Sequence, residues 1–591
     1  MKKIFTLIVA CIAAISAMAD DVQTFTGHSE FYLPDMKEAT LTTKVKDAVV
    51  LETNSDGSHF TIPDMTYNFM GTDMTIKSFV IHVESMEDLG KTDDGDVFIT
   101  WNEGNFTTTT TGVDGLEKAI TGTNFKAKLL GGKRELTVEF TFKYGTMPYG
   151  ITYSLDGFYT ADNAWGLVGE GTAACPYRIF DAADFTAMAT NYNAESNTGK
   201  GKYFLMMNDV DFGGTAENPV QLPAIGKNAD LKISSVSGGF DGTFDGGNYN
   251  ISGIYHTNNG QDADGKYNAL FSLTDVNAVI KNIRISENNH ICGYNYVGGI
   301  VSINQGTISE CINNADITAA NFAAGGICGH MVNGNGKINN CHNAGNITAM
   351  TYAAGICGSS QSGASVTTYN YYIYKCLNYG KIVTTNGVGA AGIAGSYSGK
   401  IKNCDNYGNV DDSKGTGKTV QYTAGIVSCP SYAISIEDCK NEGNISGGNS
   451  VGGIVGNAMK GEDDDVVIYN CTNNGAVSGI GDNVAGIVGN SARTDGKVTV
   501  EKCTNNGVVT STGTTELIGN IRGSEKITVG SGNAISESLE KLPLDTDNIV
   551  TGIENVTAKE NATIADGKYL KNGKLVIVKN GKTYNALGIE Q

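Results

Sequence analysis

The sequence predicts an all-β protein, in which an N-terminal antiparallel β-barrel precedes a right-handed parallel β-helix solenoid and a small C-terminal hairpin tail. Three observations predict this fold class. The 591 residues include 77 glycines but only 8 prolines, which fits a backbone whose N–H groups are mostly used in sheet ladders. Residues 20–160 alternate apolar and polar side chains with a period of two, as half-buried strands do. Residues 161–540 carry a repeat of 28 to 35 residues, which is typical of a solenoid.

Composition excludes several classes of protein. With 40% hydrophobic residues the chain can bury a core, so disorder is not its main state. The 62 acidic residues outnumber the 42 basic ones and give a formal net charge of −20, which argues against nucleic acid and anionic membrane surfaces as partners. Beyond the N-terminal segment, no stretch approaches the roughly 18 apolar residues of a membrane-spanning helix. We therefore expect no transmembrane span.

Residues 1–19 have the pattern of a signal peptide. Lys2 and Lys3 precede an apolar stretch, Ile4–Ile15, and Ala17-Met18-Ala19 forms a small-residue cleavage site. We expect cleavage after Ala19 and a secreted or cell-surface protein. Lipid attachment at Cys11 is the less favoured alternative, because apolar residues continue behind this cysteine.

Residues 20–160 form the first predicted domain. The run from Leu136 to Phe142 alternates apolar and polar residues, and glycine turns such as Asp56-Gly57 recur at short intervals. About 140 residues of such strands suit an eight-stranded up-and-down barrel, whose interior is filled or holds one small ligand. Phe25-Thr26-Gly27, Phe60–Pro63 and Tyr144–Tyr149 resemble the calycin-like domain of secreted bacterial proteins, a family similar to lipocalins. The resemblance implies a barrel with room for an apolar ligand.

Residues 161–540 form the second predicted domain, and one repeat dominates it. Two residues after each of seven regularly spaced cysteines stands an asparagine, and four residues after stands a glycine in six of the seven cases. Ile or Val occurs three residues before and six residues after each cysteine, and a [Gly/Ala]-Gly-Ile segment lies upstream. The seven cysteines are Cys311, Cys341, Cys376, Cys404, Cys439, Cys471 and Cys503.

This spacing has a physical reason in a parallel β-helix, whose right-handed coiling is expected from strand twist. Identical positions in successive coils lie roughly 4.8 Å apart, so the asparagine side chains can hydrogen-bond along the stack. We expect the following glycine to supply a positive φ at the corner. Ile, Val and Cys point inward, and the cysteines are expected to be buried free thiols. A bridge between Cys328 and Cys357 is the alternative.

The repeat resembles the GLUG motif, named for its Gly-x-x-Gly core, at Gly453–Gly456 and Gly486–Gly489. The resemblance implies a β-helical surface protein. Residues 169–190 and 238–254 resemble the lead-in of such repeats, and a short helix over Asp181–Thr190, with Asp181 as its N-cap, is expected to cover the open end of the solenoid. Residues 541–591 are predicted to form a linker and a hairpin tail, which resembles the C-terminal tails of exported surface proteins and implies surface attachment.

No set of residues predicts catalysis or a metal site. Cys328-x-His330 with Cys341-His342 could supply four zinc ligands, but Cys341 belongs to the expected core and His342 to the surface. The His-Glu-x-x-His motif of zinc peptidases is absent. We expect no cofactor. Calcium at the acidic turns Asp93–Asp96 and Asp262–Gly265 is a weak alternative, because neither turn completes a calcium-binding loop.

Binding is the expected function, because ligand contacts in a solenoid are usually built where the repeat is interrupted. The two longest intervals contain tyrosines suited to stacking on sugar rings or packing against a protein. We therefore predict an adhesin-like protein that contacts glycan or a host-surface protein. The alternatives are a polysaccharide lyase or hydrolase, which would need paired carboxylates, and a carrier of a small apolar ligand in the barrel. The predicted ligand-binding residues are Tyr369, Tyr371, Tyr374, Asp411, Asp412 and Tyr422.

Overall fold

The structure is a computed structural model of the whole chain. It describes residues 22–34, 36–69, 72–84, 88–93, 96–194, 200–226, 236–262, 265–361, 370–412, 421–458, 465–481, 483–490 and 498–511, together with the backbone of short strands between 527 and 585. The chain forms two compact units, one of residues 1–211 and 241–250 and one of residues 212–240 and 251–591. The all-β prediction is confirmed, since α2 (Ala182–Ala194) is the only helix in the described ranges.

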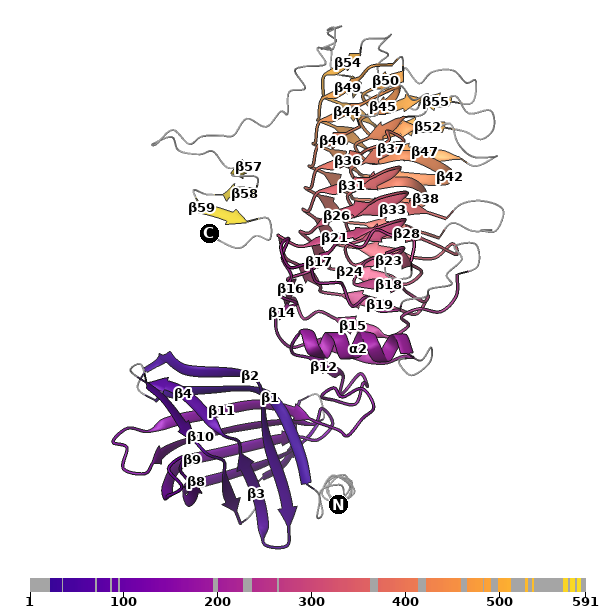
Figure 1. Cartoon of the computed structure of the whole chain (residues 1–591). Helices are drawn as coiled ribbons and strands as arrows, with labels where there is room; N and C mark the ends of the chain where they lie inside the picture. Colours follow the sequence, from indigo (N-terminus) through magenta and orange to yellow (C-terminus); the bar gives the residue numbers. More distant parts are fainter. Residues whose placement is uncertain are drawn as a thin grey trace, which may run out of the picture. The chain divides into compact units, whose positions relative to one another are not determined.

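The N-terminal strands form an antiparallel half-barrel (Figure 1). Its nine strands lie in the order β6-β3-β2-β1-β11-β10-β9-β8-β7, and β4 and β5 form a separate hairpin. The expected closed barrel of eight strands is thus corrected, because β6 and the short β7 end the sheet without pairing with each other in the described ladder. The bounds are β1 (Val22–Leu33), β2 (Met36–Asn54), β3 (Gly57–Ile62), β4 (Met65–Phe69), β5 (Thr72–Ile76), β6 (Phe79–Val83), β7 (Asp88–Lys91), β8 (Val97–Thr111), β9 (Glu117–Leu130), β10 (Glu135–Tyr144) and β11 (Ile151–Tyr159).

Aromatic side chains fill the inner face of the half-barrel. The period-two prediction is confirmed on β10, where alternate residues from Leu136 to Phe142 are buried. Trp101 is fully buried, and its indole N–H donates to Ser58 Oγ at 3.0 Å. Phe140 lies at the centre of the described core, with the rings of five other aromatic residues within 5.3 to 6.1 Å of its own. The described interior is therefore occupied by the protein's own side chains.

The segment after the half-barrel carries α2 and short strands. Asp181 Oδ1 accepts a hydrogen bond from the N–H of Asp184 at 2.9 Å, which confirms the predicted N-cap, and the helix extends four residues past the expected end. The strands β12, β13 and β15 pair in parallel. The bounds are β12 (Tyr177–Ile179), β13 (Tyr203–Met206), β14 (Val210–Asp211), β15 (Thr243–Asp245) and β16 (Asn250–Ser252).

The repeats form a parallel β-solenoid of about seven turns, in which successive coils stack strand on strand (Figure 1). We name its four sheets face 1 to face 4. Face 1 takes two strands from most coils, and each other face takes one. Face 1 comprises β18 (Phe271–Leu273), β19 (Val279–Lys281), β23 (Val301–Asn304), β24 (Thr307–Ser309), β28 (Cys328–Met331), β29 (Lys337–Asn339), β33 (Cys357–Ser360), β34 (Tyr372–Tyr374), β38 (Ala394–Lys402), β42 (Val427–Glu437), β46 (Val455–Asn457), β47 (Val466–Tyr469), β51 (Val488–Asn490), β52 (Val498–Glu501) and β55 (Ile527–Val529).

The other three faces follow in chain order within each coil. Face 2 comprises β20 (Arg284–Ile285), β25 (Ile312–Asn313), β30 (His342–Asn343), β35 (Leu377–Asn378), β39 (Asp405–Asn406), β43 (Lys440–Asn441), β48 (Thr472–Asn473), β53 (Thr504–Asn505) and β56 (Ala534–Ile535). Face 3 comprises β17 (Tyr255–His256), β21 (His290–Gly293), β26 (Asp316–Ala319), β31 (Ile347–Ala349), β36 (Ile382–Thr384), β40 (Val410–Asp411), β44 (Ile445–Gly447), β49 (Val477–Gly479) and β54 (Val509–Ser511). Face 4 comprises β22 (Tyr296–Gly298), β27 (Ala323–Gly325), β32 (Tyr352–Ala354), β37 (Gly389–Ala391), β41 (Tyr422–Ala424), β45 (Ser450–Gly452) and β50 (Asn483–Ala485).

The predicted asparagine ladder is confirmed. Each of its side chains is buried, and every amide except that of the last member, Asn505, donates to the carboxamide oxygen of the asparagine one coil further on, at 2.7 to 2.8 Å, as from Asn378 to Asn406 and from Asn406 to Asn441. The same amide also donates to the backbone carbonyl two residues later, as from Asn406 to Gly408. Both amide hydrogens are thus satisfied in the interior, which is the condition for burying a carboxamide.

The prediction that the glycine after each asparagine has a positive φ is wrong. The corner residue with positive φ, 51° to 55°, is instead the one before each repeat cysteine, and it is never glycine; Asn403 is an example. Glycine follows the asparagine because coils approach closely there: a Cβ at Gly408 would collide with the carbonyl oxygen of Gly380. The glycine before Ile in the upstream segment has a similar cause, since a Cβ at Gly392 would collide with the Asn406 side chain.

The cysteine column lies in the core, as predicted. All twelve cysteines in the described residues are buried and free, and Cys328 and Cys357 are free although they are register partners. Burial raises the pKa of the thiols of Cys439 and Cys471, so these two side chains are neutral, apolar groups of the core.

The C-terminal residues contain three short antiparallel strands, β57 (Gly567–Lys571), β58 (Lys574–Lys579) and β59 (Lys582–Asn585), one more than the predicted hairpin. The predicted signal peptide and the linker over 541–566 lie outside the described residues. No helix within the described ranges has the length and hydropathy needed to cross a membrane.

Candidate binding surface on the solenoid

The structure separates the six residues predicted to bind a ligand. Tyr369 lies outside the described residues. Tyr371 is 1% exposed; its hydroxyl accepts from the N–H of Gly334 at 2.9 Å and its ring packs near Tyr397. The prediction that Tyr371 contacts a ligand is therefore corrected, because this side chain packs inside the coil.

Asp412 is also inside the solenoid. It is fully buried and accepts hydrogen bonds from the hydroxyls of Thr384 and Thr423. The neighbouring Asp411 points outward on β40 and forms an ion pair with Lys381, with 3.4 Å between Nζ and Oδ2. The two carboxylates thus face opposite sides of one strand, and only Asp411 is accessible.

Burial makes Asp412 a source of pH-dependent stability. Burial raises its pKa to about 7, against 3.8 for an ordinary aspartate. Between these pH values the folded state holds a proton that the unfolded state has lost, so this group's contribution to stability falls as the pH rises from about 4 to 7. We expect Asp412→Asn to gain on the order of 2 kcal/mol over the natural protein at pH 8 and nothing at pH 4.

Thermal melts of the two proteins at pH 4 and pH 8 measure this difference. Asp438→Asn is the matched control: hydrogen bonding from Asn470 lowers the pKa of Asp438, so its variant should lose a little stability at pH 8. An equal gain for Asp412→Asn at both pH values would contradict the assignment of a buried neutral carboxyl.

The accessible predicted residues lie on three different faces. Tyr374 lies on β34 of face 1, Asp411 on β40 of face 3 and Tyr422 on β41 of face 4, and all are half-buried. These three residues therefore do not form one site, and of the three only Tyr374 has an aromatic stacking partner described below.

Two stacked tyrosine pairs lie on the outer surface of neighbouring coils. Tyr372 and Tyr374 alternate with the buried Ile373 on β34, and their ring centroids are 5.6 Å apart at 13°. Tyr379 and Tyr407 follow the asparagine ladder on face 2, with centroids 5.0 Å apart at 9°. All four rings are half-buried. The two pairs lie on adjacent faces, on either side of the corner at Lys375. We call Tyr372, Tyr374, Tyr379 and Tyr407 together the tyrosine platform.

Polar groups border the tyrosine platform. Lys375 Nζ lies 5.2 Å from the ring centroid of Tyr374, and the hydroxyl of Tyr407 donates to Asp405 Oδ2 at 3.3 Å. Burial and the Asp405 charge raise the pKa of Tyr379 to about 12, so its phenol is neutral at physiological pH. Flat, neutral rings beside charged hydrogen-bonding groups form the kind of surface that binds sugars or polar protein segments.

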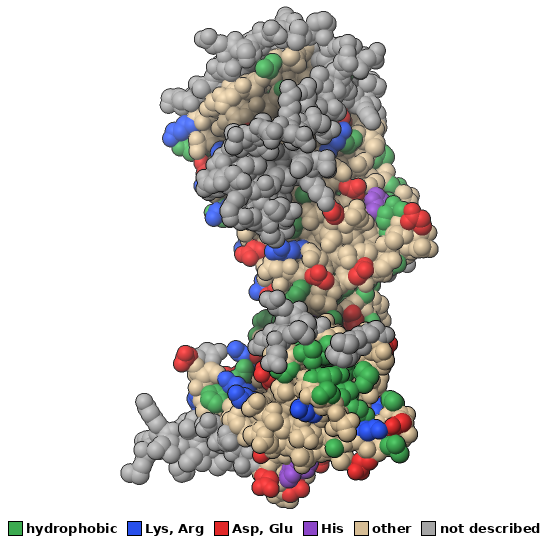
Figure 2. All heavy atoms as spheres, turned by 90° about the vertical axis from the view of Figure 1, so that its left-hand side faces the viewer, with side chains coloured by type: hydrophobic (Ala, Val, Ile, Leu, Met, Phe, Trp, Pro, Cys, Tyr) green, Lys and Arg blue, Asp and Glu red, His purple; other side chains and the backbone are tan. Residues whose placement is uncertain are grey.

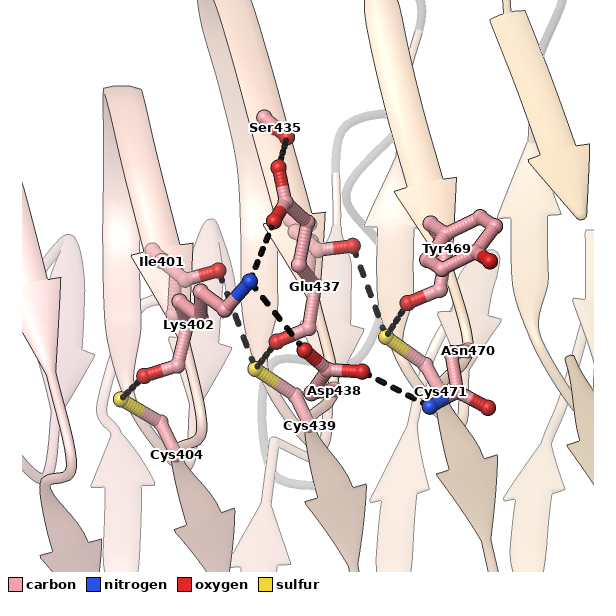
Figure 3. A network of polar contacts seen from close by, with 11 residues as sticks. Ile401, Lys402, Cys404, Ser435, Glu437, Asp438, Cys439, Tyr469, Asn470 and Cys471 are labelled. Atoms are coloured by element: carbon pink, nitrogen blue, oxygen red, sulfur yellow. Dashed lines mark hydrogen bonds and ion pairs between the residues drawn. The ribbon is translucent and has the colours of Figure 1, made fainter.

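A charged row continues face 1 beyond the platform (Figure 3). Lys402 Nζ lies 3.0 Å from Glu437 Oε2 and 3.3 Å from Asp438 Oδ2, while Ser435 donates to Glu437 and Asn470 donates to Asp438, each at 2.7 Å. The hydrogen bond from Ser435 and the charge of Lys402 lower the pKa of Glu437. The hydrogen bond from Asn470 and the charge of Lys402 lower the pKa of Asp438. Both carboxyl groups are therefore ionised, and neither is poised as a general acid.

Charge is otherwise dispersed over the visible surface. Figure 2 shows basic and acidic side chains as single residues or small groups between uncharged regions. The net charge of −20 thus has no single broad acidic patch on this face.

Among the described residues, the four zinc ligands weighed from sequence do not come together. The two acidic turns weighed for calcium lie partly outside the described residues, at 94–95 and 263–264. His330 is fully buried with Nδ1 2.7 Å from Ser359 Oγ, and burial lowers its pKa to about 3, whereas His342 is half-buried on face 2. Asp96 accepts the backbone N–H of Gly132, in the turn between β9 and β10, at 2.7 Å. Asp262 accepts that of Gly265, three residues further on, at 2.7 Å.

No family model matches the chain, and no curated protein matches it. Among solved structures, the chain is similar to the crystal structure of a "putative immunoglobulin A1 protease" from Bacteroides ovatus. The two share 19% sequence identity with a TM-score of 0.34, over 62% of this chain and 86% of the other.

Three members of the platform escaped the sequence analysis, yet a signal for two of them was present. Tyr379 and Tyr407 both stand three residues after a repeat cysteine, Cys376 and Cys404, which places them one above the other in adjacent coils. Attention to interruptions of the repeat missed them, because they occupy a regular repeat position whose side chain points outward.

Proposed function

We propose that this chain is an exported, non-enzymatic binding protein of the cell surface or the surrounding medium, which contacts glycan or a host-surface protein through the outside of its solenoid. The observation that carries the proposal is the tyrosine platform. The proposal includes the finer family resemblances: GLUG-type repeats in the solenoid, a calycin-like half-barrel, and attachment to the surface through residues 541–591.

The platform suits a sugar for physical reasons. The C–H face of a pyranose ring stacks on an aromatic ring, and Tyr379 and Tyr407 hold each other at 9°, so little side-chain entropy remains to be lost on binding. Lys375 and Asp405 lie beside the rings and can pair with hydroxyl groups. Because each coil adds a strand about 4.8 Å further along, a repeating polymer can contact several coils at once.

The enzymatic alternative, a polysaccharide lyase or hydrolase, receives less support. Glycoside hydrolysis generally needs one carboxyl group with a raised pKa beside one that is ionised, both facing the substrate. Glu437 and Asp438 are both held ionised around Lys402, and Asp412, whose pKa is raised, is buried. The carrier alternative is likewise less favoured, because aromatic side chains fill the described interior of the half-barrel.

A glycan array probed with the full chain and with Tyr379→Ala/Tyr407→Ala tests the proposal. We expect binding to a restricted set of glycans, and a roughly tenfold or greater rise in Kd for the double variant, because about 1.4 kcal/mol or more of stacking is lost. Tyr255→Ala is the matched control, since Tyr255 is a half-buried tyrosine on β17 outside the platform.

Each result has a defined meaning. Glycan binding that survives in the double variant would contradict the platform as the site. An array without any binding would contradict the glycan partner and leave a protein partner for surface-capture measurements. Shortening of a bound glycan during incubation would contradict the non-enzymatic role.

A further inference from the structure

Two histidines and an aspartate converge on the outer face of the half-barrel, far in sequence from the solenoid. His59 on β3 and His82 on the edge strand β6 are register partners, and their rings stack with centroids 4.6 Å apart at 14°. Asp56 lies in the turn that connects β2 with β3. His59 is partly exposed, while His82 and Asp56 are exposed, so the cluster is open to solvent.

The donor atoms of the cluster already lie close together. Asp56 Oδ2 is 3.9 Å from His59 Nε2, and the backbone carbonyl of Asp56 is 3.0 Å from His82 Nε2. One ligand atom from each of the three residues lies within 4.8 Å of the others. Ligands around a tetrahedral zinc ion are separated by roughly 3.3 Å, given zinc-to-ligand distances of about 2.0 Å. Rotation of the Asp56 side chain, which is 67% exposed, can bring its carboxylate to this shorter distance from the imidazole nitrogens.

The turn is shaped to admit His82. Gly57 has φ of +139°, and a Cβ at this position would lie 2.9 Å from His82 Nε2 and 2.5 Å from the carbonyl oxygen of Val83. The side chain of Asn54 accepts the N–H of Asp56 at 3.2 Å, which orients the turn. Glycine therefore leaves the space through which the imidazole of His82 reaches Asp56.

Further carboxylates surround the cluster. Glu52 on β2 is the register partner of His59, so His82, His59 and Glu52 form one rung across three strands. Glu84 follows β6, and its Cα lies 3.1 Å from the position that a Cβ on Gly57 would occupy. Glu52 and Glu84 are exposed. With Asp56 they place three carboxylates around the two imidazole rings, which attracts a cation.

We propose that Asp56, His59 and His82 form a binding site for a divalent transition-metal ion, with one ring nitrogen from each histidine and the Asp56 carboxylate as ligands. Imidazole and carboxylate are the ligand types that zinc, copper and nickel accept, whereas calcium selects oxygen ligands alone. Three protein ligands leave one position for Glu52 or water. The site is separate from the tyrosine platform and does not depend on the proposed function.

Titration of the full chain with ZnCl2, followed by isothermal calorimetry, tests the site. We expect one site per chain, a loss of affinity of tenfold or more in His82→Ala, and a similar loss in Asp56→Asn. His342→Ala is the matched control, since His342 is a half-buried histidine on face 2 of the solenoid, and its affinity should equal that of the natural protein. His82 is exposed on an edge strand, so its removal should leave the fold intact, as far-UV circular dichroism will verify.

Copper provides a second readout. The electron paramagnetic resonance spectrum of the full chain with one equivalent of Cu²⁺ should show hyperfine coupling to two imidazole nitrogens, and His59→Ala/His82→Ala should abolish it. Equal zinc affinity in the natural protein and this double variant would overturn the proposal, as would the absence of zinc binding at about 1 mM metal, a concentration that detects even weak sites.

Discussion

Replacing Asn406 with leucine is expected to destabilise the solenoid by about 3 to 5 kcal/mol, because several buried polar groups lose partners at once. Asn406 is fully buried; it accepts from Asn378, donates to Asn441 and donates to the carbonyl of Gly408. Leucine has a similar volume but satisfies none of these groups, and each buried unsatisfied group costs roughly 1 to 3 kcal/mol.

Hydrogen exchange measured by mass spectrometry locates this loss. Because each coil contacts mainly its neighbours, protection should fall first in the peptides around Asn378, Asn406 and Asn441 and spread with denaturant. Asn474→Leu is the matched control, since Asn474 is exposed on the coil surface, where its side chain donates to Glu442 and accepts from Asn506. Similar exchange in both variants would contradict an energetic role for the buried ladder.

Replacing Phe140 with alanine is expected to destabilise the half-barrel by about 3 to 5 kcal/mol, the usual cost of such a truncation in a packed core. Phe140 is 1% exposed, and the rings of Phe79, Phe106, Phe125, Phe142 and Tyr153 surround it. The cavity left behind cannot close readily, because these neighbours are anchored on different strands.

Tryptophan fluorescence during urea unfolding measures this loss, since both tryptophans of the chain, Trp101 and Trp165, belong to the N-terminal compact unit. Val113→Ala is the matched control, because Val113 is 71% exposed and should change the midpoint little. A loss below about 1 kcal/mol for Phe140→Ala would contradict a filled interior and would revive the expectation of a ligand-holding lumen.

Periodic features of the chain were predictable because they repeat. Asn378 and Asn406 each stand two residues after a repeat cysteine, Cys376 and Cys404, so they occupy the same position in two stacked coils. The hydrogen bond between the two asparagines follows from that register alone. The alternation from Leu136 to Phe142 assigned these residues to the inner face of a sheet for the same reason. The N-cap at Asp181 was readable because capping is a local interaction.

Other features depended on contacts that no local pattern encodes. Gly408 lacks a side chain because the carbonyl of Gly380 in the previous coil approaches it, whereas the positive φ occurs at non-glycine corners such as Asn403. Whether the first sheet closes into a barrel depends on whether its two end strands, β6 and β7, pair with each other. The alternation of apolar and polar residues along each strand does not predict which strands pair. Tyr371 belongs to a tyrosine-rich stretch, yet its neighbour Tyr372 is the accessible one, because strand alternation sends the two to opposite sides.

Sequence alone was sufficient for the all-β class, the stacked coils and the identity of the buried ladder, since these follow from spacing and side-chain chemistry that recur many times. The candidate sites required three dimensions. Tyr379 and Tyr407 stack across coils, and Asp56, His59 and His82 meet across a turn and two paired strands. Each site forms only once, from residues that different strands bring together, so a repeated sequence pattern cannot predict it.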